Sequence, residues 1–193
     1  MHRHLNAAVA ALAAALTLAG CQQAAPPAAN SAPAPAAANA APAPVAATGA
    51  DAADAKAFLE GLYAHYKSAE NNSFDLYDKD APSVFDQDTL ALMQTEKAAL
   101  KGDAGARDAD SVCTCQDFTG LTAKVTIVSI TPTTAKAGVD FHDTGQTETN
   151  HIDYDLTKGP NGWRVHDIHS FSQPSFRASL NEDIKDAKSA PAG

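Results

Sequence analysis

Four segments of alternating apolar and polar residues follow one another in the second half of this 193-residue chain. Alternation with a period of two is typical of strands that bury one face. The connections between the segments are short and rich in Pro, Gly, Asn and Asp, which favours hairpins. The sequence therefore predicts an antiparallel meander of four strands at residues 123–130, 133–142, 148–157 and 163–169.

The two central strands have one register that keeps their apolar side chains on the same face. It places Asp140 opposite His151 and Lys136 opposite Asp155. A slip of two residues would instead place Asp140 opposite Asp153, and like charges directly opposite each other destabilise a sheet. We therefore expect the first register, with pairs of opposite charge on the outer face.

The last hairpin is expected to continue this pattern, with Asp155 opposite Arg164 and Asp153 opposite His166. The alternation breaks near Asp167, which indicates a β-bulge at that point. Such a bulge would turn the Asp167 carboxylate inward, toward a pocket. Histidines paired with carboxylates on a solvated face are more typical of a charge lattice than of a catalytic or metal site.

Helical periodicity precedes the strands. Asp51 or Asp54 can cap a first helix, and Asp86 or Asp88 can cap a second helix that runs to Lys101. The first helix has a single apolar stripe, formed by Phe58, Leu59, Leu62, Tyr63 and Tyr66.

A mostly polar surface helix is predicted after the strands, at residues 175–187. Helices that precede an antiparallel meander indicate an α+β fold. We expect a curved antiparallel sheet of about four long strands, packed on the N-terminal helices, which cover one of its faces.

The motif Leu18-Ala19-Gly20-Cys21 closes a short apolar segment and resembles the lipobox of bacterial lipoproteins. The apolar run before it is too short to span a bilayer as a helix. The resemblance implies that residues 1–20 are a signal peptide and that Cys21 carries the lipid. Gln22, where inner-membrane lipoproteins usually have Asp, favours an outer-membrane lipoprotein facing the periplasm. The alternative is an ordinary secretory signal with an incidental cysteine.

Residues 21–50 are interpreted as the lipidated N-terminus and a disordered tether. Residues 24–50 contain 15 Ala and 6 Pro, and Val45 is their one bulky apolar residue. Proline interrupts helices, and a segment without apolar side chains has nothing to bury. A single domain is expected at residues 51–188, followed by a flexible C-terminus at residues 189–193.

The chain is acidic, with 14 Lys and Arg against 23 Asp and Glu and a formal net charge of −9. Binding to nucleic acid or to anionic lipid requires clustered basic side chains. We therefore expect no nucleic-acid partner, and contact with the membrane through the lipid anchor alone. We also expect no cofactor.

Cys113 and Cys115 form a pair of thiols in a compartment that is expected to be oxidising. In a regular strand, residues i and i+2 lie at the upper limit of disulfide geometry, so a bond between them requires a local turn. The alternatives are two packed free thiols, or metal or redox chemistry. The C-x-x-C spacing of redox motifs is absent.

Several of these segments together resemble a bacterial lipoprotein domain, the domain-of-unknown-function (DUF) family 3828. The resemblance covers roughly residues 54–185 and rests on Tyr63-Ala64-His65-Tyr66, Phe85-Asp86, Cys113-Thr114-Cys115-Gln116-Asp117 and Trp163-Arg164-Val165-His166-Asp167-Ile168. It implies a nuclear-transport-factor-2-like, cystatin-like fold with a conical cavity. It implies no catalytic residues.

Three functions fit the sequence. The first is a non-enzymatic domain of a membrane-anchored periplasmic lipoprotein that binds an envelope protein or a small ligand. The second is a small-ligand-binding or isomerase-like enzyme that uses the cavity, and the third is a metal carrier with Cys113, Cys115 and a histidine as ligands. The candidate pocket residues are Tyr63, Tyr66, Asp117, Trp163 and Asp167.

The lipid site yields a first prediction. Because lipid is expected on the Cys21 thiol, Cys21→Ser should release the protein from membranes or block its processing. Fractionation of cells into membrane and soluble material measures this. Normal membrane retention of the variant would contradict the lipoprotein interpretation.

Overall fold

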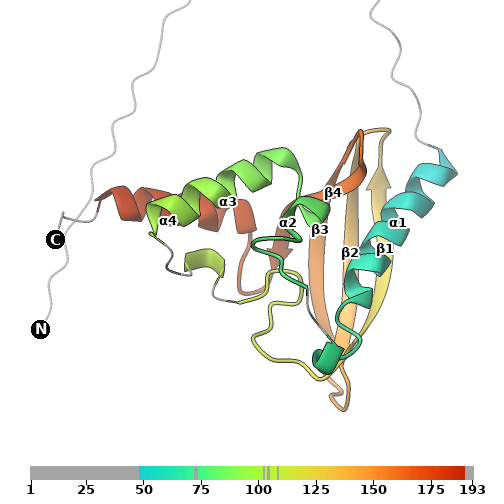
Figure 1. Cartoon of the computed structure of the whole chain (residues 1–193). Helices are drawn as coiled ribbons and strands as arrows, with labels where there is room; N and C mark the ends of the chain where they lie inside the picture. Colours follow the sequence, from blue (N-terminus) through green and yellow to red (C-terminus); the bar gives the residue numbers. More distant parts are fainter. Residues whose placement is uncertain (1–47, 72–73, 102, 104, 108, 190–193) are drawn as a thin grey trace, which may run out of the picture. The chain divides into compact units, whose positions relative to one another are not determined.

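The computed structural model describes residues 48–71, 74–101, 103, 105–107 and 109–189 (Figure 1). The signal peptide, Cys21, residues 21–47 of the tether and residues 190–193 lie outside the described residues. The described chain has an α+β fold, as predicted, with a four-stranded antiparallel sheet packed with helices. No helix in this part of the chain is long and apolar enough to cross a membrane.

The sheet is the predicted meander, with its strands in sequence order and each one antiparallel to the next. Gly145 and Gly162, in the turns that follow the second and third strands, have positive φ values of 85° and 89°. Glycine adopts this conformation without a steric penalty. The strands are β1 (Leu121–Ile130), β2 (Thr134–Asp143), β3 (Asn150–Gly159) and β4 (Gly162–Ser170).

The register predicted for the β2–β3 hairpin is confirmed. Asp140 lies opposite His151 and Lys136 lies opposite Asp155. The Nδ1 atom of His151 is 2.7 Å from an Asp140 oxygen, and this hydrogen bond raises the pKa of His151. Lys136 Nζ is 2.5 Å from an Asp155 oxygen. The charged pairs occupy the outer face, as the alternation requires.

The register predicted for the β3–β4 hairpin is wrong. Arg164 lies opposite Thr157 rather than Asp155, and His169 rather than His166 lies opposite Asp153. The reason is the turn, because Gly162 already pairs with the last residue of β3 and the loop is shorter than the one predicted. A shorter loop moves every pair along the hairpin.

The bulge predicted near Asp167 is confirmed. Leu156 pairs with Val165, but the next pair joins Asp155 to Asp167, so His166 is the extra residue. The bulge leaves the Asp167 residue 8% exposed. In a regular strand, Asp167 and Ile168 would point to opposite faces of the sheet. The bulge changes this local alternation, so both residues are buried.

The first helix, α1 (Gly49–Ala64), begins before the predicted caps. Its N-cap is Thr48, whose side chain accepts from the Asp51 N–H, and Asp51 in turn accepts from the Thr48 N–H at 2.9 Å. Asp51 is therefore the third residue of a capping box and not the cap. The predicted stripe packs inward on β1, with Leu59, Leu62, Tyr63 and Tyr66 buried and Phe58 partly buried.

The remaining helices are α2 (Ala81–Val84), α3 (Gln87–Ala99) and α4 (Phe176–Ser189), with short 3₁₀ turns η1 (Ala69–Asn71) and η2 (Gly105–Arg107). Asp86 caps α3, as one of the predicted alternatives required. The helix ends two residues before Lys101, which has a positive φ of 55°.

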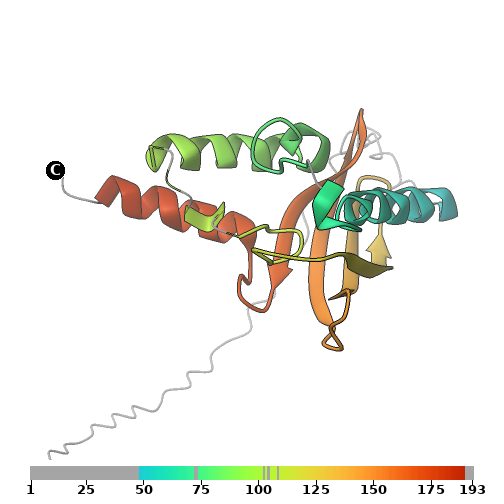
Figure 2. The ribbon, with the colours of Figure 1, turned by 60° about the horizontal axis from the view of Figure 1, so that its bottom comes forward.

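Helices α3 and α4 pack on each other beside β4, whereas α1 crosses the sheet (Figure 2). The expectation that the helices together cover one face therefore applies to α1 and not to α3 and α4. The C-terminal helix is also less polar in its packing than predicted, because Phe176, Leu180 and Ile184 are buried. Helix α4 packs on α3, and the residue pattern of α4 alone does not show this contact.

The packing of α4 can be tested at Leu180, whose side chain is fully buried. Leu180→Ala should lower the free energy of unfolding by about 2–5 kcal/mol, because it removes buried apolar surface and leaves a cavity. Urea unfolding measures the change. The control Lys185→Ala, at an exposed position of the same helix, should stay within about 0.5 kcal/mol of the wild type. Equal losses in the two variants would mean that α4 is not packed as described.

Candidate functional site

Tyrosine side chains fill the interior between α1 and the sheet. The hydroxyls of Tyr63 and Tyr154 both donate to the carbonyl oxygen of Val112, at 2.7 and 2.9 Å, and lie 3.0 Å from each other. Tyr66 donates to the carboxylate of Asp110 at 2.7 Å. All three rings are buried. The hydroxyls are thus bonded to the loop that follows η2.

Burial also sets the ionisation of this cluster. Desolvation raises the pKa of Tyr63, of Tyr66 and of Tyr154, so the phenols stay neutral at physiological pH. Desolvation likewise raises the pKa of Asp110, against the opposing effect of its hydrogen bonds from Tyr66 and from backbone N–H groups. The cluster is therefore suited to holding the loop against the core.

The candidate pocket residues predicted from the sequence do not come together. Tyr63 and Tyr66 lie in the interior cluster, and Asp117 is exposed. Trp163 is buried, and its indole Nε1 has no hydrogen-bond partner among the described residues. Asp167 points toward the start of α4, where it accepts from the Ser175 hydroxyl at 2.7 Å and from a backbone N–H. Its inward turn serves that helix and not a pocket.

Cys113 and Cys115 form a disulfide with a Cα–Cα distance of 5.1 Å. Thr114 between them has a positive φ of 51°, which supplies the local turn that a regular strand lacks. Both sulfurs are used in this bond. Across the described ranges, no three His, Cys, Asp or Glu side chains are grouped so that they could hold a metal ion. The metal-carrier hypothesis therefore has no ligand set in this part of the chain.

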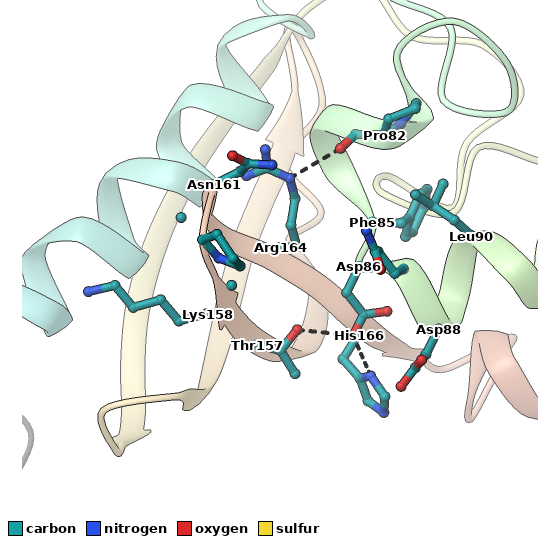
Figure 3. Close-up of a pocket in the computed structure, with 14 residues that line it drawn as sticks. Pro82, Phe85, Asp86, Asp88, Leu90, Thr157, Lys158, Asn161, Arg164 and His166 are labelled. Carbon is teal, nitrogen blue, oxygen red and sulfur yellow. Dashed lines mark hydrogen bonds and ion pairs between the residues drawn. The ribbon is translucent and has the colours of Figure 1, made fainter. Parts of the chain in front are cut away.

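A groove of about 560 Å³ lies between the β3–β4 turn and the segment that joins α2 to α3 (Figure 3). We call it the hairpin groove. Its walls combine apolar and polar side chains, among them Pro82, Asp86, Leu90, Asn161, Arg164 and His166. Two hydrogen bonds fix this arrangement of segments: the Asp86 N–H donates to the Val165 carbonyl, and the Thr89 hydroxyl donates to the His166 carbonyl.

Asp86 connects both walls of the hairpin groove. Its carboxylate lies 2.6 Å from His166 Nδ1 and accepts from the Thr157 hydroxyl at 3.0 Å and from the Thr89 N–H at 2.9 Å. Burial by itself would raise the pKa of Asp86, but these hydrogen bonds outweigh burial and lower it. Asp86 is therefore an ionised carboxylate that caps α3 and orients the His166 ring.

Arg164 is held in the hairpin groove by backbone carbonyls. Its Nε donates to Pro82 O at 3.2 Å and its Nη1 donates to Trp163 O at 2.7 Å. Among the described residues, no carboxylate lies within salt-bridge distance of the guanidinium. Two anchored nitrogens fix the plane of the guanidinium, and its other N–H groups remain available as donors.

Sequence reasoning missed the hairpin groove because it placed Arg164 and His166 in the wrong register. The expected register pairs Arg164 with Asp155 and His166 with Asp153. Each positive side chain would then have a carboxylate partner on the outer face of the sheet. Asp155 instead contacts Lys136 and, at 3.2 Å, His169. The signal in the sequence was Pro160-Asn161-Gly162, because Pro and Asn favour a tight type I turn and Gly162 can adopt the positive φ that follows it.

The sequence matches no protein-family model and no curated protein. Among solved structures, the chain is similar to a phospholipid-binding protein from Ralstonia solanacearum, whose structure was determined in complex with a phospholipid. The identity is 14%, the TM-score is 0.37, and the match covers 71% of this chain and 82% of that one. The resemblance is distant.

The role of Asp86 predicts a pH-dependent loss of stability. Asp86→Asn should lower the free energy of unfolding at pH 7 by about 1–3 kcal/mol, because the amide can still cap α3 but loses the charged hydrogen bonds to His166 and Thr157. The folded pKa of Asp86 is lowered, so its contribution is complete above the unfolded pKa and is lost as pH falls through the folded value. The difference between the two proteins should therefore shrink below about pH 4.

Chemical unfolding at several pH values measures this difference. Asp88→Asn is the matched control, because Asp88 is an exposed carboxylate in the first turn of the same helix. This control should change stability much less at every pH. A difference between wild type and Asp86→Asn that is constant down to pH 2 would contradict the assigned role.

Proposed function

We propose that this protein is an outer-membrane lipoprotein, anchored through lipid on Cys21, whose periplasmic domain binds the anionic group of a ligand in the hairpin groove. The proposal is a non-enzymatic binding function. It includes the nuclear-transport-factor-2-like fold and the relationship to DUF family 3828 that the sequence resemblance implies. In this arrangement the Ala/Pro-rich tether lets the domain reach ligands away from the membrane surface.

The observation that carries the proposal is the fixed guanidinium of Arg164. Arg164 is half-buried and has no carboxylate partner among the described residues, although the chain has a net charge of −9. Its remaining N–H groups match the oxygens of a carboxylate or a phosphate. Because two carbonyls already hold the side chain, little rotamer entropy is lost on binding.

Neighbouring residues add a second polar contact and an apolar wall. His166 presents its ring beside the groove, with Nδ1 fixed by Asp86, so Nε2 is directed away from that carboxylate. Asn161 supplies an amide at the turn. Pro82, Leu90 and Pro160 line the groove and provide surface for an apolar part of the ligand.

Catalysis receives less support than binding. An enzyme that used Asp167 or Asp117 with Tyr63 or Tyr66 would need these groups to face one cavity, but the tyrosine hydroxyls are engaged and the carboxylates lie elsewhere. The Asp86–His166 pair resembles a general-base arrangement. Its carboxylate, however, also caps α3 and binds Thr157, so the pair has a structural function that explains its geometry.

The anion site can be tested by NMR titration of the full chain in micelles. The probes are inorganic phosphate, acetate and a short-chain phosphatidylglycerol, which separate a free anion from a lipid headgroup. We expect shifts that cluster in residues 82–90 and 157–166. Arg164→Gln should weaken binding by about tenfold to a hundredfold, because a charged hydrogen bond contributes about 1.5–3 kcal/mol.

Lys136→Gln is the matched control, since it removes a positive charge from the outer face without touching the hairpin groove. It should leave the affinity unchanged. Thermal unfolding of both variants verifies that they remain folded. Equal affinity of wild type and Arg164→Gln, shifts confined to another surface, or the absence of shifts with every probe would each refute the proposal.

A further inference from the structure

Strand β1 leaves one edge of the sheet open. It pairs with β2 on one side, and within the described chain no strand pairs with its other side. The edge is regular from Leu121 to Ile127, where a bulge at Val128 interrupts the ladder. Leu121 is already bonded to the Tyr66 carbonyl, so residues 123–127 are the open part of this edge, and an open edge is a template for another strand. Figure 1 shows β1 at the margin of the sheet, beside α1.

Alternate residues of β1 direct their backbone groups at the open edge. Gly120 O accepts from Thr144 N, which places the even-numbered residues in the hydrogen-bonded pairs with β2. The N–H and C=O groups of Ala123, Val125 and Ile127 therefore point away from β2. Leu121 follows the same rule, because its N–H donates to the Tyr66 carbonyl rather than to β2.

A groove of about 400 Å³ follows this edge between β1 and the end of α1. We call it the edge groove. Tyr63 and Lys67 line it on one side, and Leu121, Ala123 and Val125 line it on the other. Ala123 and Ile127 are only partly buried although their side chains face the core, and Val128 is 68% exposed. Apolar surface thus remains to be covered along the open edge.

Two cations beside the edge have no carboxylate partner among the described residues. Lys67 and Lys124 are exposed, and neither forms an ion pair with any described carboxylate. Glu60 in the edge groove pairs with Lys56, and Asp140, the cross-strand neighbour of Lys124, is bonded to His151. In an acidic chain, this edge is therefore suited to a partner with negative side chains.

We propose that the open edge of β1 binds an extended acidic segment of another protein, which adds a fifth strand to the sheet. Side chains of that strand on the inner face would enter the edge groove and pack on Ala123 and Val125. Acidic side chains on its outer face would lie beside Lys124. This interaction is separate from anion binding at Arg164 and does not depend on it.

Two other occupants fit the edge less well. A second copy of the chain would place its own Lys67 and Lys124 beside this edge. It would not supply the acidic side chains that these lysines could pair with. The tether of this chain contains six prolines in residues 24–50 and no Asp or Glu in residues 1–50. Proline lacks the N–H that a strand needs to join a ladder.

Two defined peptides test the proposal with the full chain in micelles. Each is a blocked seven-residue peptide in which valine alternates with glutamate (the acidic probe) or with lysine (the basic probe). Fluorescence anisotropy measures affinity, and amide hydrogen exchange measures protection. We expect tighter binding of the acidic probe, and at least tenfold slower exchange at Ala123, Val125 and Ile127 when it is bound.

Two variants separate backbone pairing from charge. Ala123→Pro removes an N–H that points at the open edge, not at β2, and should abolish binding of the acidic probe while the fold is retained. Lys124→Glu should lower affinity for the acidic probe by at least threefold and raise affinity for the basic probe. Lys185→Glu, on α4, is the matched control and should leave both affinities unchanged.

Several results would overturn the proposal. These are equal affinity for the two probes, no protection of the three amides, or protection without peptide that increases with protein concentration, which would indicate pairing of two copies. If Ala123→Pro fails to fold, the opposite responses of Lys124→Glu still decide the question. Arg164→Gln should not change peptide affinity, so failure here is distinguishable from failure of the anion site.

Discussion

The carbonyl oxygen of Val112 is the point on which the interior of this domain depends. It accepts hydrogen bonds from Tyr63 of α1 and Tyr154 of β3, so one acceptor connects the helix, the sheet and the disulfide-containing loop. A buried hydroxyl without a hydrogen-bond partner lowers the stability of the fold. The Val112 carbonyl supplies a partner to both hydroxyls. Because the loop fills this part of the interior, the two surfaces that we propose for binding lie outside it, at the β3–β4 turn and at the β1 edge.

Asp86 has a comparable role at the β4 edge of the sheet. A single carboxylate caps α3, accepts from Thr157 and orients His166, and this holds the helical pair beside β4. Of the two carboxylates that line the hairpin groove, Asp86 is engaged in this network and Asp88 is exposed in the first turn of α3. The guanidinium of Arg164 has backbone carbonyls as its partners, which leaves its positive charge available to a ligand.

Both proposed binding surfaces contain cations that form no ion pair with a described carboxylate. Lys56, Lys136 and Lys158 pair with carboxylates, whereas Arg164, Lys67 and Lys124 do not. The two surfaces differ in the chemistry they favour. A fixed guanidinium in a groove recognises a compact anion, while a row of unpaired backbone groups beside exposed lysines recognises an extended acidic chain.

The sequence by itself determined the α+β class, the order of the four strands and the register of the β2–β3 hairpin, because side-chain alternation and opposite charges act between neighbours along a hairpin. It also indicated a bulge near Asp167, from the break in alternation. Tertiary structure decided the rest. The β3–β4 register depends on a two-residue turn, and the partner of α4 is a helix about 80 residues earlier in the chain. The interior is closed by a loop without periodicity. These features arise from contacts between distant residues, which no local pattern encodes.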